Sequence, residues 1–193
     1  MAKVEVKPYP AVFPVPVAFL SAYEPATRKP NIITLAWVGN VCSEPPCLSV
    51  SIRPSRYSHH IVMEKREFCL NIPRADQLEV VDYCGVVSGR DHDKFAETGL
   101  TPVRASTVNA PYIAECPVNI ECRLVREPIS LGTHDVFIAE IVAVHIEEEY
   151  LADNARRPAY ERIVPLTYCP EQYFSLGEKL EPYGWTKGKL GGR

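Results

Sequence analysis

The sequence lacks any long apolar run. Its most apolar early stretch, residues 11–20, contains Pro14 and Pro16 and is shorter than the roughly 20 residues that a helical membrane span needs. The residues before it carry lysine and glutamate and then prolines, without the basic-then-apolar order of a secretory signal peptide. We therefore expect no membrane association and a cytoplasmic location.

Cysteine pairs at metal-ligand or redox-motif spacing are also absent. The chain has 7 cysteines, an odd number at irregular spacings, and no CxxC pair. This pattern disfavours a zinc ribbon and a thioredoxin-like motif. In a chain without an export signal, the ordinary interpretation is reduced and mostly buried thiols.

Charge of one sign is not strongly in excess. The formal net charge is −3, and both signs are mixed along the chain. A nucleic-acid-binding protein would be expected to carry a clustered basic face. We therefore expect no nucleic-acid partner.

The glycine-rich loops that hold nucleotide phosphates are missing as well. There is no G-x-G-x-x-G or Walker sequence, and residues 85–89 read G-x-x-S-G, one place away from the nucleophile elbow G-x-S-x-G. His59, His60 and the segment 91–93 offer metal-ligand residue types without the i, i+4 spacing of a helical zinc motif. Their ordinary interpretation is exposed loop or helix residues.

What the sequence does contain is a large apolar fraction cut into short segments. Hydrophobic residues make up 46% of the 193 residues, which is typical of one globular domain, and many of the 18 prolines separate the apolar segments. Residues 186–193 are rich in glycine and lysine and are expected to fray or to drape over a neighbour. We expect a single domain over residues 1–193, with a core over about 14–177 and a C-terminal tail over 178–193.

Alternation with a period of two predicts several half-buried strands. In residues 47–53, the apolar Leu48, Val50 and Ile52 alternate with polar residues. Residues 135–146 are apolar on both faces and rich in β-branched residues, which predicts a central strand. The same reasoning predicts strands over residues 31–38, 68–72 and 118–125.

Short helices are predicted between these strands, over residues 58–65, 76–83 and 91–98. Asp76 is expected to cap the start of the second helix and Gly85 its end, and Gly99 is expected to end the third. The crossover helices of a doubly wound parallel sheet, about 10–15 residues long, are missing. The sequence therefore favours a mainly β fold, a β-barrel with short helices.

An ordered set of short motifs runs through most of the chain. The motifs are P-V-A-F-L-S at 16–21, P-N-I-I-T-L-A-W at 30–37, P-P at 45–46, S-I-R at 51–53, Ser58, F-C-L-N at 68–71, S-G at 88–89, D-K-F at 93–95, L-G at 131–132 and His134. In this order, from about residue 14 to about residue 177, they resemble the flavin-reductase-like branch of the FMN-binding split barrels, including flavoredoxin-like and archaeal ferric-reductase-like members. The resemblance implies an FMN-binding split barrel.

The resemblance also implies which residues contact the flavin, and it implies no catalytic acid or base. Lys94 matches the flavin-proximal lysine of the D-K-F motif, where a positive charge favours the reduced, anionic flavin. The implied contacts come from a first strand (Asn31, Thr34, Ala36 and Trp37), from a second strand (Ser51, Ile52 and Arg53), from Ser58 in the loop after it, and from Lys94, His134 and Tyr168.

Elementary chemistry is compatible with these roles, although each residue has an ordinary alternative. The guanidinium of Arg53 can bind a phosphate bidentately, and the indole of Trp37 can lie against a flat ring. Taken singly, a tryptophan in a strand is more often a core residue, and an arginine more often a surface residue. Lys94 alone is an ordinary helix-face lysine, and His134 alone a polar loop residue.

For function, the resemblance implies an FMN-dependent oxidoreductase that works as a homodimer with the flavin near the subunit interface. The first hypothesis is a flavin reductase that passes electrons from NAD(P)H through the bound flavin nucleotide to a flavin, ferric or protein acceptor. The alternative is a flavoredoxin-like electron-transfer flavoprotein that exchanges electrons with a redox-protein partner and makes no direct use of nicotinamide. A third hypothesis is a binder of a different ligand on the same barrel, because a fold does not fix a function.

Overall fold

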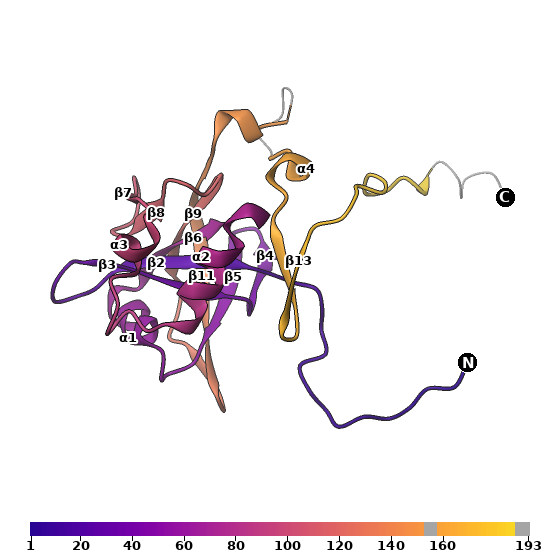
Figure 1. Ribbon diagram of the computed structural model, residues 1–193, viewed down its shortest axis with the longest axis horizontal. Helices are drawn as coiled ribbons and strands as arrows, with labels where there is room; N and C mark the ends of the chain where they lie inside the picture. Colours follow the sequence, from indigo (N-terminus) through magenta and orange to yellow (C-terminus); the bar gives the residue numbers. More distant parts are fainter. Residues whose placement is uncertain (153–157, 188–193) are drawn as a thin grey trace.

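An eight-stranded antiparallel sheet forms the centre of the protein in a computed structural model that describes residues 1–152 and 158–187 (Figure 1). Its strands lie in the order β3-β2-β6-β9-β11-β5-β4, and β10 pairs with β11. The strands of this sheet are β2 (Ala18–Tyr23), β3 (Pro30–Leu35), β4 (Val38–Ser43), β5 (Pro46–Ile52), β6 (Glu67–Ile72), β9 (Val118–Leu124), β10 (Ile129–Leu131) and β11 (His134–Ile146).

The two edge strands of this sheet, β3 and β4, follow each other directly in the chain. Only Ala36 and Trp37 separate them, so the sheet must curl until its edges meet. The main-chain N–H of Ser51, on β5, donates to the carbonyl oxygen of Trp37 at 2.9 Å and fixes this junction. The predicted β-barrel with short helices is therefore confirmed.

The predicted strand over residues 31–38 is wrong as a single element, because the chain breaks at this junction. Its first part pairs with β2, and Val38 begins a new strand that pairs with β5. The N–H of Val38 donates to the carbonyl of Ala36 at 3.0 Å, which makes a tight bend. A period-two pattern cannot show this bend, since the residues on both sides of it are apolar.

The central position predicted for residues 135–146 is confirmed, since β11 pairs with β5 on one side and β9 on the other. Its inner face carries the buried Phe137 and Ala139. Its outer face is less covered than a strand apolar on both faces suggests, because Val136 and Ile138 are only half-buried.

Smaller elements cover one end and one side of the barrel (Figure 1). The hairpin β12–β13 pairs through β12 with β1, and β7 pairs with β8. Their bounds are β1 (Val15–Pro16), β7 (Pro102–Arg104), β8 (Pro111–Ile113), β12 (Leu166–Cys169) and β13 (Gln172–Ser175). The helices are α1 (Tyr57–Lys65), α2 (Leu78–Val86), α3 (Lys94–Thr98) and α4 (Tyr160–Ile163), with 3-10 turns η1 (Ala75–Gln77) and η2 (Glu148–Tyr150).

The helix ends differ in part from the sequence expectations. Asp76 does not cap α2, because it lies inside the preceding turn η1, where its carboxylate pairs with Arg74. Gly85 does not end α2 either, since the helix continues to Val86. The expected stop of α3 at Gly99 is confirmed by a left-handed φ of 72°. The side chain of Asp93 caps its start by accepting from the N–H of Ala96 at 3.2 Å.

Alternate side chains of β2 enter two different apolar clusters. Leu20 packs inside the barrel with Phe68 and Phe137, whereas Phe19 packs outside it with Val81 of α2 and with α3. The sheet therefore buries both faces here, and α2 is held against its outer face beside the junction between β3 and β4.

Most of the cysteines are buried, as expected from the sequence. All 7 are free, and those at positions 47, 69, 84, 116 and 122 are buried. Cys42 is exposed and Cys169 is half-buried. Among the described residues, no group of histidine, cysteine, aspartate and glutamate side chains could hold a metal ion. His59, His60 and the segment 91–93 therefore form no such group.

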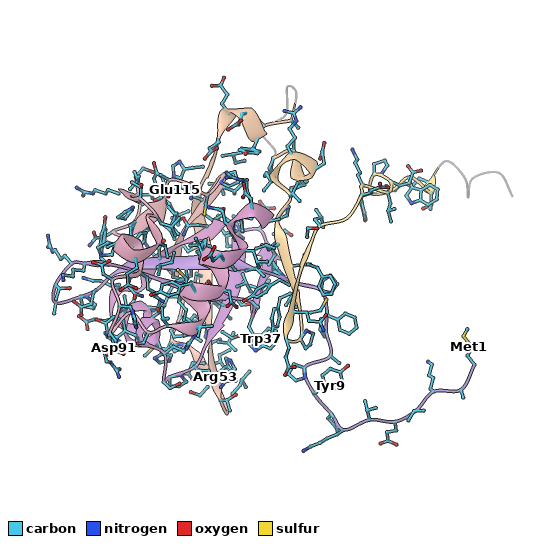
Figure 2. All side chains as sticks on the ribbon, viewed as in Figure 1. Met1, Tyr9, Trp37, Arg53, Asp91 and Glu115 are labelled. Atoms are coloured by element: carbon cyan, nitrogen blue, oxygen red, sulfur yellow. The ribbon has the colours of Figure 1, made fainter. Side chains whose placement is uncertain are left out.

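The two ends of the chain extend away from the barrel (Figures 1 and 2). The N-terminal arm, residues 1–14, is exposed along its whole length, and so are residues 176–183. Of the glycine- and lysine-rich stretch expected to fray, residues 188–193 lie outside the described residues. In the ranges 1–152 and 158–187, no helix is long and apolar enough to cross a membrane.

A fully buried carboxylate, Glu121 on β9, ties the segment after β7 to the barrel. It accepts hydrogen bonds from the main-chain N–H groups of Ser106, Thr107 and Val108, at 3.0, 2.7 and 2.9 Å, and lies 2.6 Å from the imidazole Nε2 of His145. Burial by itself would raise the pKa of Glu121, but the hydrogen bonds from His145 and from the loop lower it to about 2.

Replacing this carboxylate with an amide is expected to destabilise the protein. Glu121→Gln leaves N–H donors facing an NH₂ group, and we expect the free energy of unfolding at pH 7 to fall by about 3 kcal/mol in urea titrations. Because the folded-state pKa is depressed, the native carboxylate stabilises the fold above about pH 4.5, and this contribution is lost as the pH falls toward 2. The difference between variant and wild type should therefore shrink in acid. The exposed Glu64→Gln is the control and should change stability by less than about 0.5 kcal/mol; equal effects of the two variants would contradict the assignment.

Candidate functional site

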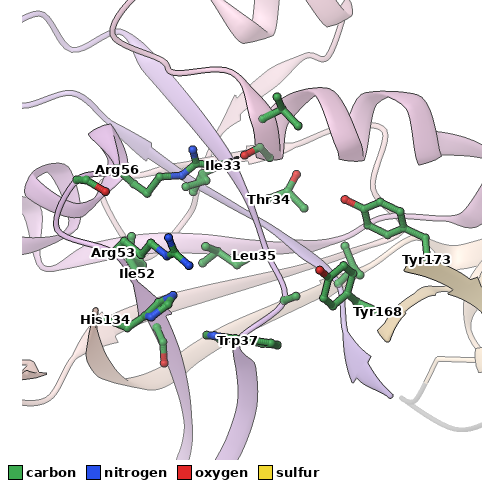
Figure 3. Close-up of a pocket in the computed structure, with 16 residues that line it drawn as sticks. Ile33, Thr34, Leu35, Trp37, Ile52, Arg53, Arg56, His134, Tyr168 and Tyr173 are labelled. Atoms are coloured by element: carbon green, nitrogen blue, oxygen red, sulfur yellow. Dashed lines mark hydrogen bonds between the residues drawn. The ribbon is translucent and has the colours of Figure 1, made fainter. Parts of the chain in front are cut away.

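A cavity of about 500 Å³ opens where the junction between β3 and β4 meets β5, the end of α2 and the hairpin β12–β13 (Figure 3). This volume lies within the range of about 300–1,000 Å³ usual for pockets that hold small molecules and cofactors. The junction contributes Ala36 and Trp37 to the lining, and β5 contributes Ser51 and Ile52. The bend that closes the barrel therefore also makes one wall of the cavity.

One end of the cavity is cationic. Figure 3 shows Arg53, Arg56 and His134 together on this side. The guanidinium of Arg56 donates to the carbonyl of Gly85 near the end of α2. Burial, followed by the charge of Arg53, lowers the pKa of His134 below its ordinary value, so this histidine is neutral at pH 7.

Neither arginine has a carboxylate partner among the ion pairs of the described residues. Their positive charge is therefore not neutralised from within the part of the chain that the structure describes. A guanidinium presents a planar fork of N–H donors that matches the oxygens of a phosphate. This end of the cavity is suited to an anionic group.

The opposite end is aromatic. The rings of Trp37 and Tyr168 meet edge to face with centroids 6.3 Å apart, and those of Tyr168 and Tyr173 do so at 5.6 Å. Burial, and then the hydrogen bond to Asp82 at 3.1 Å, raises the pKa of Tyr173 to about 12. Since Tyr168 lies opposite Val15 in the pairing of β12 with β1, the hairpin is held in place over the cavity.

The wall between the two ends is formed by β3 and α2. The hydroxyl of Thr34 donates to the carbonyl of Val81 at 2.6 Å and joins the two elements. A methyl group on Gly85 would lie 3.4 Å from the Cβ of Thr34, so the helix approaches the strand closely at this glycine. The result is a narrow slot with polar groups at one end and flat rings at the other.

Most of the residues singled out from the sequence meet at this cavity, although they come from four segments of the chain. The structure places the following around it: Thr34, Ala36, Trp37, Ser51, Ile52, Arg53, His134 and Tyr168.

Asn31, Ser58 and Lys94 do not line it. Asn31 donates to the hydroxyl of the buried Ser58 at 2.8 Å, and Asn31 and Lys94 line a neighbouring cavity of about 290 Å³. The ammonium of Lys94 is buried and donates to the carbonyls of Cys84 and Val87, at 3.0 and 3.4 Å. Burial lowers its pKa to about 8. In this structure Lys94 therefore binds the carboxyl end of α2, behind the larger cavity.

The S-G motif at residues 88–89 has a steric reason in this second cavity. A Cβ atom on Gly89 would lie 2.0 Å from the side-chain oxygen of Asn31 and 3.2 Å from the ring of Tyr57. Only glycine leaves room for the Asn31 amide at this point. The motif thus fixes the loop before α3 against β3.

Sequence reasoning missed several lining residues, notably Ser55, Arg56, Gly85 and Tyr173. Ser55 and Arg56 follow Arg53 closely in one loop, so the S-I-R motif could have been extended to include them. Gly85 and Tyr173 carry no comparable signal, because their positions depend on how α2 and the hairpin β12–β13 pack.

Comparison with known proteins identifies the family and the fold. The family model described as "Flavin reductase like domain" matches residues 11–177. The structure is similar to flavoredoxin of Desulfovibrio vulgaris (Miyazaki F), with a TM-score of 0.88 and 34% identity over 95% of this chain and 98% of that chain. It is also similar to flavoredoxin from Methanosarcina acetivorans, with a TM-score of 0.84 and 30% identity over 97% and 100% of the two chains. In sequence, the reductase component of FADH(2)-dependent resorcinol hydroxylase from Rhizobium sp. (strain MTP-10005) is 26% identical over 137 residues, 70% of this chain and 73% of that protein. The chain therefore belongs to the flavin-reductase-like family and has its split-barrel fold.

Proposed function

We propose that this protein is an FMN-dependent oxidoreductase that takes electrons from NAD(P)H and passes them to a flavin, ferric or protein acceptor. The observation that carries the proposal is the polarity of the 500 Å³ cavity, which has arginines without carboxylate partners at one end and aromatic rings at the other. FMN has the same polarity, with a phosphate at one end and a flat ring system at the other. The family and the two flavoredoxins support flavin as the ligand class.

The residues present fit this cofactor. Arg53, Arg56 and Ser55 would hold the phosphate, and Trp37 and Tyr168 would flank the ring system. Thr34 and Ser51 offer hydroxyl groups between the two ends. When bound, the flavin would supply the redox chemistry of the proposed function.

The chain itself contributes position and charge. The neutral His134 lies beside Arg53 and can donate or accept a hydrogen bond without adding charge. Lys94, held on the carbonyls of α2, places a positive charge behind the wall of the slot. We propose that Lys94, with Asn31 and Ser58, acts on the flavin through this wall, by fixing the position of α2 against β3.

A second function is favoured by the full-length similarity to two flavoredoxins, each of which is covered almost completely. In that function the protein is an electron-transfer flavoprotein whose flavin exchanges electrons with a redox-protein partner, with no direct use of nicotinamide. The cavity serves both functions equally, so only the electron donor distinguishes them.

We further propose a single domain, a cytoplasmic location and a twofold homodimer. The free state of all 7 cysteines supports a reducing compartment. We place the interface with a second copy at Val144 of β11, an apolar side chain that is 51% exposed.

FMN binding tests the cofactor assignment. Purified protein mixed with FMN is expected to retain the visible flavin absorption bands after desalting. Arg53→Ala should weaken FMN binding about tenfold to a hundredfold, because a charge-assisted contact to the phosphate is lost, and should leave the affinity for riboflavin, which has no phosphate, unchanged. Arg104→Ala, on the exposed strand β7, is the control and should change neither affinity. A loss of both affinities in Arg53→Ala would place the phosphate elsewhere, and no flavin uptake by the wild type would remove the redox function.

Anaerobic reduction tests the electron donor. With the FMN-loaded protein, NADH or NADPH alone is expected to bleach the flavin absorption within seconds if the reductase function is correct. Reduced ferredoxin is the comparison donor and is tested separately, at the same concentration and under the same anaerobic conditions. Bleaching by the reduced protein but not by either nicotinamide would establish the electron-transfer function instead.

Light scattering after size exclusion tests the dimer. The expected mass is twice that of one chain. Val144→Lys, at an exposed position of β11, should shift the protein toward the monomer without changing its circular dichroism, because it places a charge in the proposed interface. A monomeric wild type would contradict the proposed homodimer.

A further inference from the structure

Two cysteines face each other across the hairpin of β4 and β5, at the end far from the cavity. Cys42 and Cys47 are directly opposite in the antiparallel pairing of these strands, and a four-residue connection, Ser-Glu-Pro-Pro, joins them. No other pair of cysteines is in register in the sheets of the described residues. This pair has no part in the proposed flavin chemistry.

The backbone geometry allows a bond between the two sulfurs. Directly opposite residues of an antiparallel pair have Cα atoms about 4.5–5.5 Å apart and side chains on the same face. A disulfide requires a Cα–Cα separation of about 4.4–6.8 Å. The register of the hairpin therefore places the two cysteines at the Cα separation that a disulfide requires.

The two thiols differ in exposure. Cys42 is exposed, and its thiol makes only a weak contact with the carbonyl of Glu44 at 3.4 Å. Cys47 is buried, and its pKa is raised by burial first, and then by the nearby Cys42 and Glu140. Cys42 is therefore the thiol that a reagent in solution reaches, and Cys47 is the neighbour positioned to react with the product.

The surroundings argue against a metal site at the same place. Glu140 of β11 is opposite Cys47 in the next ladder of the sheet, so a carboxylate lies in the same row as the two thiols. Even so, no set of three metal-ligand side chains with suitable geometry exists among residues 1–152 and 158–187. Two thiols without a third ligand are suited to oxidation rather than to metal binding.

We propose that Cys42 and Cys47 are a reversible redox site, which forms a cross-strand disulfide by exchange with a small-molecule disulfide such as glutathione disulfide. The thiolate of Cys42 attacks one sulfur of the reagent and releases one glutathione thiolate. The thiolate of Cys47 then attacks the sulfur of Cys42 and releases the second glutathione. The two protein thiols are oxidised by two electrons, the reagent is reduced by two, and two protons pass from the cysteines to the released glutathiones.

The bond would close the hairpin at the end opposite the cavity. The register of β4 and β5 shifts between Asn40 and Cys42, so the ladder is irregular just before the pair. At the other end of the same hairpin, the N–H of Ser51 donates to the carbonyl of Trp37 and forms the cavity wall. Oxidation would therefore cross-link the far end of the β4–β5 hairpin, whose near end lines the cavity.

Alkylation after controlled oxidation tests the proposal. The reduced full-length protein is incubated with mixtures of glutathione and glutathione disulfide, quenched with N-ethylmaleimide, and digested with trypsin. Because no lysine or arginine lies between the two cysteines, both are released on one peptide, and that peptide contains no other cysteine. We expect this peptide to lose both alkyl labels and to become about 2 Da lighter than its reduced, unlabelled form as the disulfide fraction rises.

Matched variants identify the bond. Cys42→Ser should abolish the lighter peptide, while its exposed position leaves the fold intact, as circular dichroism can verify. Cys169→Ser, which removes a half-buried cysteine opposite Gln172, should form the bond as the wild type does. The proposal is overturned if both labels persist in excess glutathione disulfide, if the peptide retains a bound glutathione, or if non-reducing electrophoresis shows a Cys42-dependent dimer instead of the internal bond.

Discussion

The two-residue link between β3 and β4 is the constraint on which the rest of the structure depends. These strands are the two edges of the sheet, and a link of two residues can join them only if the sheet curls into a barrel. The bend leaves Trp37 outside both ladders, with its carbonyl bound to the N–H of Ser51. The bend that closes the barrel therefore also places the indole of Trp37 in the cavity.

Two cations, one at the cavity and one behind its wall, are held by main-chain oxygens. Arg56 and Lys94 both donate to carbonyls at the carboxyl end of α2, where the last turn of a helix has unpaired acceptors and a partial negative charge. A carboxylate would satisfy the same donors but would cancel the positive charge. Binding to carbonyls keeps the side chains in place and leaves the net charge available to an anionic ligand.

The hairpin of β4 and β5 connects the cavity to the opposite end of the barrel. Its near end supplies Trp37 and Ser51 to the slot, and its far end carries the opposed Cys42 and Cys47. An antiparallel ladder transmits register along its length, since a slip of one residue would reverse every side chain. A chemical change at the tip thus acts on the same rigid element that shapes the site.

The sequence by itself determined the mainly β class, the order of the strands that alternate, and the ordered motifs that place the chain in its family. Alternation in residues 47–53 is local and needs no partner, which is why β5 was predicted within one residue of its observed ends. Only the tertiary structure decided where the predicted strand over 31–38 breaks, because the bend depends on the pairing of β4 with β5. It also decided that Lys94 binds α2 instead of lining the larger cavity, and that Arg56 and Tyr173 do line this cavity. The position of Cys42 opposite Cys47 was likewise decided by the strand pairing. The sequence alone could not predict these features. Each depends on the packing of a segment that is far away in the sequence, or on a strand register that the whole sheet fixes.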